Sequence, residues 1–233
     1  NEYRFLFLDA IFLKVKTGLG TKKRVVLVAY GIKVSGKREL IDFMIVKHES
    51  ENAWGSFIMN LYQRGLTADS LELIITDGSY GLINTLDMVY PRVPLKRCWV
   101  HKLRNVANYL RKKDIDPCMK ELRGIYNARN RKEAVETYFE WAKRWRPISE
   151  KAVRCMEKDM EDLLHFYSFS GPMRVKLRTT NVIERAFREI RRRTRPMSCF
   201  NNNKSIERIV YAVLSHLNDQ WGRTPLKEFT QKG

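Results

Sequence analysis

The sequence predicts an α/β fold in which a mixed β-sheet is flanked by helices and interrupted by an all-helical segment. Three observations predict it. The first third of the chain is rich in β-branched and apolar runs, helix and strand patterns then alternate, and from about residue 102 every strong period is helical. With 233 residues, 44% of them hydrophobic, the chain is long enough to bury a sizeable core.

Three strands are expected first, joined by short links. Residues 4–15 form one apolar run, residues 24–34 form a second run rich in β-branched side chains, and residues 39–47 form a third after the turn-prone Gly36. Links this short are typical of antiparallel hairpins. The chain opens almost directly on the first strand, so we expect it to be a fragment of a longer protein.

Helices and strands alternate in the next part of the chain. Residues 51–65 have apolar side chains at helical spacing, residues 71–76 form a strand, residues 80–90 suit a helix, and a short fifth strand is expected at 95–100. The resulting order, β-β-β-α-β-α-β-α, is that of the ribonuclease H-like fold.

Only helices are expected in residues 102–170, which we interpret as an all-helical insertion. Two further helices are expected at residues 181–195 and 204–220. The predicted organisation is therefore a core whose first part is residues 1–101, the insertion, and a last part of the core at residues 171–233 that carries a strongly basic helix.

The chain has 44 Lys and Arg residues against 26 Asp and Glu residues, a formal net charge of +18. A surplus this large favours polyanion partners, most simply nucleic acid, over a basic surface without a specific partner. An anionic membrane is a weaker alternative, because no basic amphipathic helix with an aromatic face stands out. No run of 18 apolar residues and no signal peptide is visible, and the four scattered Cys residues have no disulfide-like spacing, so a reducing interior is expected.

A single carboxylate, Asp9, interrupts the first apolar run. Burying an ionised Asp in a central strand costs on the order of several kcal/mol unless a cation or hydrogen bonds compensate it. We therefore expect Asp9 to have a partner, which is either an internal Arg or Lys or a metal ion.

Two further carboxylates stand at places of interest. Asp77 follows the strand expected at 71–76, and open α/β sheets place their sites at the carboxyl ends of strands. The alternative for Asp77 is ordinary Asp-Gly turn chemistry. Glu184 begins the basic helix, where Asn181 at the N-cap and Glu184 at N3 would fit a capping box, and where Glu184 and Arg188 have the favoured order for an ion pair.

The basic helix presents two faces. At about 100° per residue, its side chains fall into a charged row and an adjacent apolar stripe. The charged row, within about 60°, is Glu184, Arg188, Arg191 and Arg195, and the stripe expected to pack is Ile183, Phe187, Ile190 and Thr194. A carboxylate at the head of an arginine row suits a site that binds a metal and then follows phosphates.

Asp9, Asp77 and Glu184 could converge on a divalent cation. Mg²⁺ prefers few carboxylates together with water and phosphate oxygens. Two such ions about 4 Å apart can activate an attacking oxygen and stabilise a leaving one. That arrangement is the one needed for in-line phosphodiester chemistry.

Four segments carry a resemblance to a known family. They are FLFLDAIFLKV at 5–15, LIITDG at 73–78, CWVHKLRNV at 98–106 and, most specific, LRTTNVIERAFREIRRRTRPMSCF at 177–200. In this order they resemble the catalytic domain of the Mutator-like transposases, known in bacteria and archaea as the IS256 family. The resemblance covers nearly the whole chain and implies a ribonuclease H-like core with a helical insertion before the last acidic residue.

The resemblance also implies chemistry and partners. It implies a DDE triad of Asp9, Asp77 and Glu184 that uses Mg²⁺, with Mn²⁺ as a substitute and two ions once DNA is bound. An activated water would cleave DNA at the transposon end, and the resulting 3′-hydroxyl would attack target DNA without a covalent protein–DNA intermediate. It further implies a homodimer in the active complex, no membrane partner, and a location on the nucleoid in the cytoplasm of a prokaryote or in the nucleus of a eukaryote.

Cys98 and His101 match the family's C-x-x-H motif. Without a second ligand pair of matching spacing they are a poor zinc signature, so we expect a structural role or one that supports the site. Candidate DNA contacts come mainly from the basic helix, with Lys102 and Arg104 as weaker candidates. The helix supplies Arg185, Arg188, Arg191, Arg192, Arg193 and Arg195.

Trp141 and Trp145 lie four residues apart on an expected helix. Either they pack within the insertion, or one of them stacks on an exposed base near the cut site.

Two other functions stay open at this point. One is a transposase-derived DNA-binding protein without catalysis, and the other is a different metal-dependent nuclease on the same fold. The intact acidic set argues against the first, because a module that only binds DNA has no need of it. The helical insertion and the segment from TTNVIER to RRRTRPM argue against the second.

Overall fold

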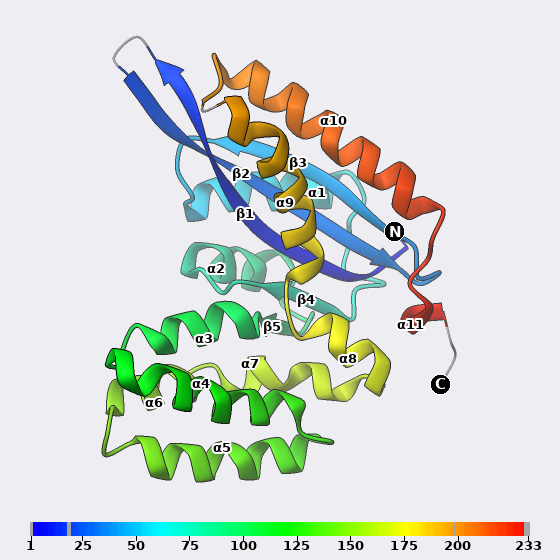
Figure 1. The fold of residues 1–233 in the computed structure, drawn as a ribbon. Coiled ribbons are helices and arrows are strands. Elements are labelled where there is room, and N and C mark those ends of the chain that lie inside the picture. Colours follow the sequence, from blue (N-terminus) through cyan, green and yellow to red (C-terminus); the bar gives the residue numbers. More distant parts are fainter. Residues whose placement is uncertain (1, 18–19, 198, 231–233) are drawn as a thin grey trace. The chain divides into compact units, whose positions relative to one another are not determined.

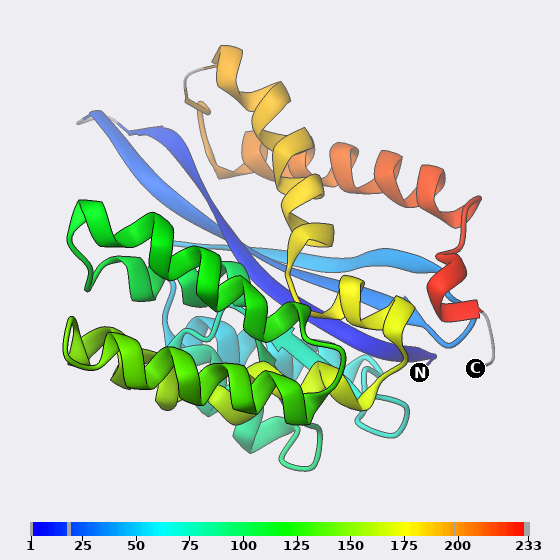
Figure 2. The ribbon, with the colours of Figure 1, turned by 60° about the horizontal axis from the view of Figure 1, so that its bottom comes forward.

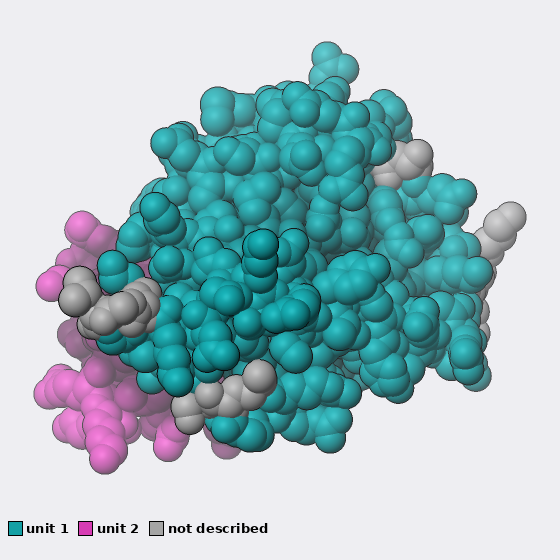
Figure 3. Space-filling model, turned by 90° about the horizontal axis from the view of Figure 1, so that it is seen from above, with its two compact units in different colours: residues 1–94, 180–233 teal, residues 95–179 magenta. Residues whose placement is uncertain are grey.

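The computed structural model describes residues 2–17, 20–197 and 199–230 (Figure 1). The chain divides into two compact units, which Figure 3 distinguishes by colour. Unit 1 consists of Asn1–Pro94 and Thr180–Gly233, and unit 2 of Leu95–Thr179. No helix within the described ranges is long and apolar enough to cross a membrane.

Unit 1 is built on a mixed sheet with the strand order β3-β2-β1-β4. Its strands are β1 (Tyr3–Thr17), β2 (Gly20–Lys33), β3 (Arg38–Val46) and β4 (Leu73–Thr76). β1 is antiparallel to β2 and parallel to β4, and β2 is antiparallel to β3. The predicted α/β class with a mixed sheet and two opening hairpins is therefore confirmed.

The first hairpin is longer than predicted. The β1–β2 ladder continues to the pair formed by Thr17 and Gly20. At this end of the hairpin Lys14, Lys16 and residues 20–23 are exposed. The chain remains a strand there, but its continuous apolar character has ended, so the sequence pattern stops early.

Helices cover both faces of this sheet (Figures 1 and 2). On one face lie α1 and α2, and on the other α9 and α10. The bounds are α1 (Glu51–Gln63), α2 (Tyr80–Val89), α9 (Asn181–Thr194), η2 (Arg195–Met197), α10 (Asn203–Gly222) and α11 (Lys227–Thr230). α1 and α2 approach closely at Gly81, where a Cβ atom would lie 2.7 Å from the backbone nitrogen of Glu51.

Aromatic contacts identify which β1 side chains face the C-terminal helices. The Phe5 ring packs against Phe229 of α11 at 5.2 Å between centroids, and Phe7 packs against Tyr30 at 5.4 Å. Tyr30 in turn contacts Trp221 of α10 at 5.7 Å. Because side chains alternate along a strand, the odd-numbered residues of β1 face the C-terminal helices.

Unit 2 is almost entirely helical. It begins with the short strand β5 (Leu95–Arg97). The helices that follow are α3 (Trp99–Ala107), α4 (Lys112–Asn127), α5 (Arg131–Trp145), α6 (Glu150–Glu157), α7 (Met160–Leu164), η1 (His165–Ser168) and α8 (Gly171–Leu177). Residues 102–170 contain only helices and connections, as predicted. The compact unit extends beyond these residues at both ends, and its assignment as an insertion stays a prediction.

The fifth strand is shorter than predicted because α3 begins at Trp99. The Trp99 side chain is fully buried, and its Nε1 donates a hydrogen bond of 3.0 Å to the carbonyl of Leu163. Burial of this large ring in a helical environment overrides the local strand-like pattern of residues 95–100.

Candidate active site

Strand register brings Asp9 and Asp77 to neighbouring backbone positions. In the parallel ladder of β1 and β4, Leu8 pairs with Thr76 as the last pair. Asp9 and Asp77 are the next residues along the two chains. Since neighbouring strands lie about 4.8 Å apart, the backbones of these two residues, far apart in sequence, lie side by side at the carboxyl end of β4. The sequence marked both residues but could not give this register.

Asp9 is 6% exposed and, as an odd-numbered residue of β1, lies on the same face as Phe5 and Phe7, toward the C-terminal helices. Its Oδ1 accepts a hydrogen bond of 2.7 Å from the N–H of Ala10. The side chain is thus held next to its own backbone, in a strand that pairs with β2 at Asp9 itself and with β4 up to Leu8. A rigid position of this kind suits a ligand that must not move when its partner binds.

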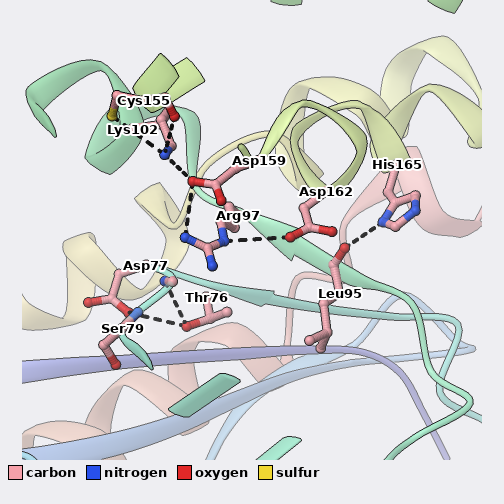
Figure 4. Close-up of polar contacts among 11 residues, drawn as sticks. Thr76, Asp77, Ser79, Leu95, Arg97, Lys102, Cys155, Asp159, Asp162 and His165 are labelled. Carbon is pink, nitrogen blue, oxygen red and sulfur yellow. Dashed lines mark hydrogen bonds and ion pairs between the residues drawn. The ribbon is translucent and has the colours of Figure 1, made fainter. Parts of the chain in front are cut away.

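Asp77 occupies the turn between β4 and α2 (Figure 4). Its Oδ1 accepts hydrogen bonds from the N–H of Ser79 at 3.0 Å and from the hydroxyl of Thr76 at 3.2 Å. Gly78 follows with a φ of 88°, a conformation that favours glycine. The turn chemistry expected as an alternative is present, and it also fixes the orientation of the carboxylate.

Glu184 lies in the first turn of α9 and is half-buried. The predicted capping box is wrong. The N-cap residue is Thr180 rather than Asn181, so Glu184 is the fourth helical residue, one position beyond the place from which a capping side chain reaches back. Glu189, further along α9, forms ion pairs with Arg192 and Arg193, both at 2.9 Å.

The apolar stripe of α9 is confirmed, since Ile183, Phe187, Ile190 and Thr194 are all buried. α9 contacts β1. Beyond the end of the helix, the N–H of Phe200 donates to the carbonyl of Lys14 at 2.8 Å, and the N–H of Lys16 donates to the carbonyl of Phe200 at 2.6 Å. The chain after α9 is therefore fixed to the far end of β1.

α9 and the stretch of β1 that begins at Asp9 are of similar length. The 14 residues of α9 span about 21 Å. The stretch of β1 from Asp9 to Val15, which forms a bridge with Phe200, spans about 20 Å. α9 crosses the sheet over β1 (Figure 1), and its length is close to that of this stretch of β1.

Asp9, Asp77 and Glu184 all belong to unit 1. Within residues 2–17, 20–197 and 199–230, no group of three or more His, Cys, Asp or Glu side chains is placed to hold a metal ion. The donor set of Asp9, Asp77 and Glu184 consists of carboxylate oxygens only, which is the chemistry that Mg²⁺ and Mn²⁺ prefer. The residue types therefore fit such an ion.

The six arginines of the basic helix, Arg185, Arg188, Arg191, Arg192, Arg193 and Arg195, are all exposed. Arg191 and Arg195 lie on the flank of the helix that carries Glu184, whereas Arg185 and Arg192 turn toward α10, where they line a cleft. The exposure leaves every one of these guanidinium groups accessible to a large anionic partner.

Trp141 and Trp145 lie in the core of unit 2, at 2% and 4% exposure. Trp141 Nε1 donates to Sγ of Cys118 at 3.4 Å, and Trp145 Nε1 donates to Oε2 of Glu121 at 3.1 Å. Both rings are therefore packing residues of the helical unit, and the assignment of either as a base-stacking DNA contact is corrected.

Cys98 and His101 belong to α3 and its start. Cys98 is fully buried at the N-cap, and His101 is half-buried in the helix. The weaker DNA candidate Lys102 is 5% exposed and ion-paired with Asp159, so burial removes it from any DNA surface.

A buried ion cluster in unit 2 was missed from the sequence (Figure 4). Asp159 is 3% exposed and forms ion pairs with both Lys102 and Arg97, the latter at 3.0 Å. Lys102 also donates to the carbonyl of Cys155 at 3.1 Å, and Arg97 lies 3.5 Å from Asp162. Asp159 stands in a run of mixed charges, where no sequence pattern separates a buried carboxylate from exposed ones.

The known proteins that this chain is similar to are transposases. A family model described as "Transposase, Mutator family" matches residues 1–224. The transposase for insertion sequence element IS406 of Burkholderia multivorans is 35% identical over 222 residues, covering 95% of this chain and 57% of the relative. The transposase for ISRM5 of Rhizobium meliloti is 32% identical over 221 residues, covering 95% and 55%. The transposase for IS256 in transposon Tn4001 of Staphylococcus aureus is 32% identical over 230 residues, covering 95% and 56%. The chain thus spans little more than half the length of these relatives.

Proposed function

The chain belongs to the Mutator family of transposases, and on that premise we propose that it carries the catalytic part of a DNA transposase. The proposed reaction is cleavage of a DNA strand at the transposon end, followed by transfer of that end to target DNA. The observation that carries the proposal is the register of β1 and β4, which sets Asp9 beside Asp77. The strand order, together with helices on both faces of the sheet, supports a ribonuclease H-like core with a helical insertion.

Asp9, Asp77 and Glu184 are the proposed ligands for Mg²⁺ or Mn²⁺. When bound, the metal would supply Lewis-acid chemistry for phosphodiester cleavage. The protein fixes each ligand by a different device. Pairing with β2 holds Asp9, the turn hydrogen bonds orient Asp77, and the packing of α9 on β1 supports Glu184.

The exposed arginines of α9 are the proposed phosphate contacts. Arg191 and Arg195 share a flank with Glu184, so a DNA backbone that follows this flank would be led to the carboxylates. Such contacts carry affinity and position the DNA, but they read little sequence. Homodimerisation of the active complex stays a prediction.

Conservative substitutions of the three acids test the proposal. In the full-length protein, Asp9→Asn, Asp77→Asn and Glu184→Gln are each expected to lower Mg²⁺-dependent strand transfer by at least about 10³-fold, because each removes a charged ligand. DNA affinity, measured by fluorescence anisotropy, is expected to stay within about twofold of the wild type, since the phosphate contacts remain.

Asp87→Asn is the matched control, because Asp87 is an exposed carboxylate on α2. It should keep wild-type strand transfer. Near-wild-type transfer by one of the three variants would remove that residue from the catalytic set. A full-length wild-type protein that binds DNA but transfers no strand with either metal would instead support the alternative of a DNA-binding protein without catalysis.

A further inference from the structure

Unit 1 contains a cleft of about 520 Å³ between α9 and α10, on the flank of α9 away from Arg191 and Arg195. Its lining is Arg185, Arg188, Glu189, Arg192 and Arg193 from α9, and Val213, His216, Leu217, Gln220 and Trp221 from α10. We propose that this cleft binds the phosphate backbone of a single-stranded DNA segment. The proposal rests on the proposed DNA-processing function and adds a second nucleic-acid contact to it.

The charge of the cleft favours a phosphate-bearing ligand. Four arginines and one glutamate line it, a surplus of three positive charges. Glu189 is bonded to Arg192 and Arg193. In the described part of the chain, Arg185 and Arg188 have no carboxylate partner. Guanidinium groups in a concave site concentrate the positive potential, and they match phosphate oxygens in geometry.

The α10 side of the cleft adds apolar and aromatic surface. Val213 and Leu217 are buried beneath it. The Trp221 ring makes two contacts, a T-shaped one with Tyr30 at an interplanar angle of 83° and one with the Arg38 guanidinium, 5.0 Å from its centroid. Cations beside fixed apolar surface form the combination that single-strand binding grooves use for backbone and bases.

The size of the cleft argues for one strand rather than a duplex. Its volume lies within the range of about 300 to 1,000 Å³ that sites for small-molecule-sized ligands span, which suits one or two nucleotides. A duplex keeps its bases stacked inside and presents a convex backbone. On the helix, Arg185 lies about 100° from Glu184 and Arg191 only about 20°, so the two nucleic-acid contacts would use different sides of α9.

Binding measurements distinguish the proposed single-strand contact at Arg185 from the proposed duplex contact at Arg191. The probes are a labelled oligothymidylate of about 15 nucleotides and a blunt duplex of equal length. Both are titrated by anisotropy over a salt series, in the Glu184→Gln background with EDTA. Arg185→Ala should weaken oligothymidylate binding by at least about fivefold and flatten its salt slope by about 0.7, with duplex binding changed by less than about twofold. Arg191→Ala should do the reverse, with a duplex slope flatter by about 0.9.

A second variant changes the α10 side of the cleft. Gln220→Glu places a negative charge on exposed α10 and should also weaken oligothymidylate binding selectively, while thermal melting confirms that each variant is folded. Unchanged oligothymidylate binding by Arg185→Ala would overturn the proposal. So would an equal loss for both probes, or displacement of the strand by polyglutamate as readily as by unlabelled oligothymidylate. These readouts need no catalysis, so a failure of strand transfer would leave their result intact.

Discussion

Asp9 is the residue on which the site is built. It is a buried carboxylate in an interior strand, with one described hydrogen bond from the N–H of Ala10. That bond ends on Oδ1, which an asparagine would retain as an amide oxygen. Burial in an apolar strand disfavours the negative charge, and a bound cation would reduce that cost.

Asp9→Asn is accordingly expected to raise the melting temperature of the metal-free protein. Removing about 1 kcal/mol of unfavourable burial corresponds to about 2 to 4 °C for a chain of this size. The measurement is thermal unfolding in EDTA, with Asp87→Asn as the exposed control. A clear fall in melting temperature for Asp9→Asn alone would show that the charge is stabilising without metal.

For single residues, the sequence showed that a carboxylate such as Asp9 lies in an unusual place, but it did not show which groups bind that carboxylate. Asp9 stood out because its neighbours are apolar. The helix cap was misassigned because Thr180 and Asn181 are both capping residue types, and only the backbone conformation decides between them. Asp159 gave no signal, because its burial depends on packing between helices rather than on local pattern.

Besides lining the cleft, α10 provides hydrogen bonds to the edge strand β3 of the sheet. β3 ends the strand order, and Leu40 lies at an irregularity in its pairing with β2. The Asn218 side chain of α10 accepts from the N–H of Leu40 at 2.8 Å and donates to its carbonyl at 2.9 Å. The amide group thus satisfies both backbone groups of a buried edge residue, as a neighbouring strand would.

Asn218→Ala should therefore lower the free energy of unfolding by about 1 to 3 kcal/mol, because the backbone groups of Leu40 lose both partners. Urea unfolding of the variant measures this, and Asp219→Ala, at the next and exposed position, serves as control. An equal, small effect of both substitutions would mean that water replaces the amide at no cost.

Elements with strong periodicity were predictable and short ones were not. The apolar stripe of α9 and the long apolar runs of β1 and β2 predicted both the kind of element and its position in the chain. The fifth strand was drawn too long because Trp99 and Val100 suit a strand locally, whereas burial against Leu163 places them in a helix. The register that aligns Asp9 with Asp77 depends on pairing between distant segments, which a pattern in one segment does not encode.

In the molecule as a whole, burial of charge is concentrated in unit 2. Lys96 is fully buried, donates to the carbonyl of Arg178, and lies 5.8 Å from the centroid of the Phe166 ring. Burial lowers the pKa of Lys96 to about 7, an effect that nearby Cys98 partly offsets. The unfolded chain would instead titrate this group near 10.5.

This difference predicts a pH dependence of stability. Between pH 7 and 10.5 the unfolded chain holds the Lys96 proton and the folded protein does not, so the contribution of Lys96 to the free energy of unfolding rises with pH. Below pH 7 both states are protonated and the full cost is present. Relative to Lys96→Met, the wild type should gain stability on the order of 4 kcal/mol across this window.

Urea unfolding of both proteins from pH 6.5 to 10.5 measures the difference, with Lys113→Met as an exposed control. A difference that stays constant with pH would mean that the folded protein keeps Lys96 protonated.

For the whole molecule, the sequence predicted the fold class and the kind of partner. The order of patterns predicted the mixed sheet and the helical stretch, and the +18 charge predicted a polyanion partner. The extent of the second compact unit was not predictable, because β5 and the residues after 170 join it through tertiary contacts.

The central claim is that Asp9, Asp77 and Glu184 together hold a catalytic metal ion. Anomalous diffraction from crystals of the full-length protein with Mn²⁺ and a DNA end tests it most directly. We expect a manganese peak about 2.0 to 2.3 Å from carboxylate oxygens of Asp9 and Asp77, with Glu184 bound to the same ion or to a second one about 4 Å away. A well-ordered complex whose manganese peaks lie elsewhere, with these three carboxylates bound to none of them, would contradict it.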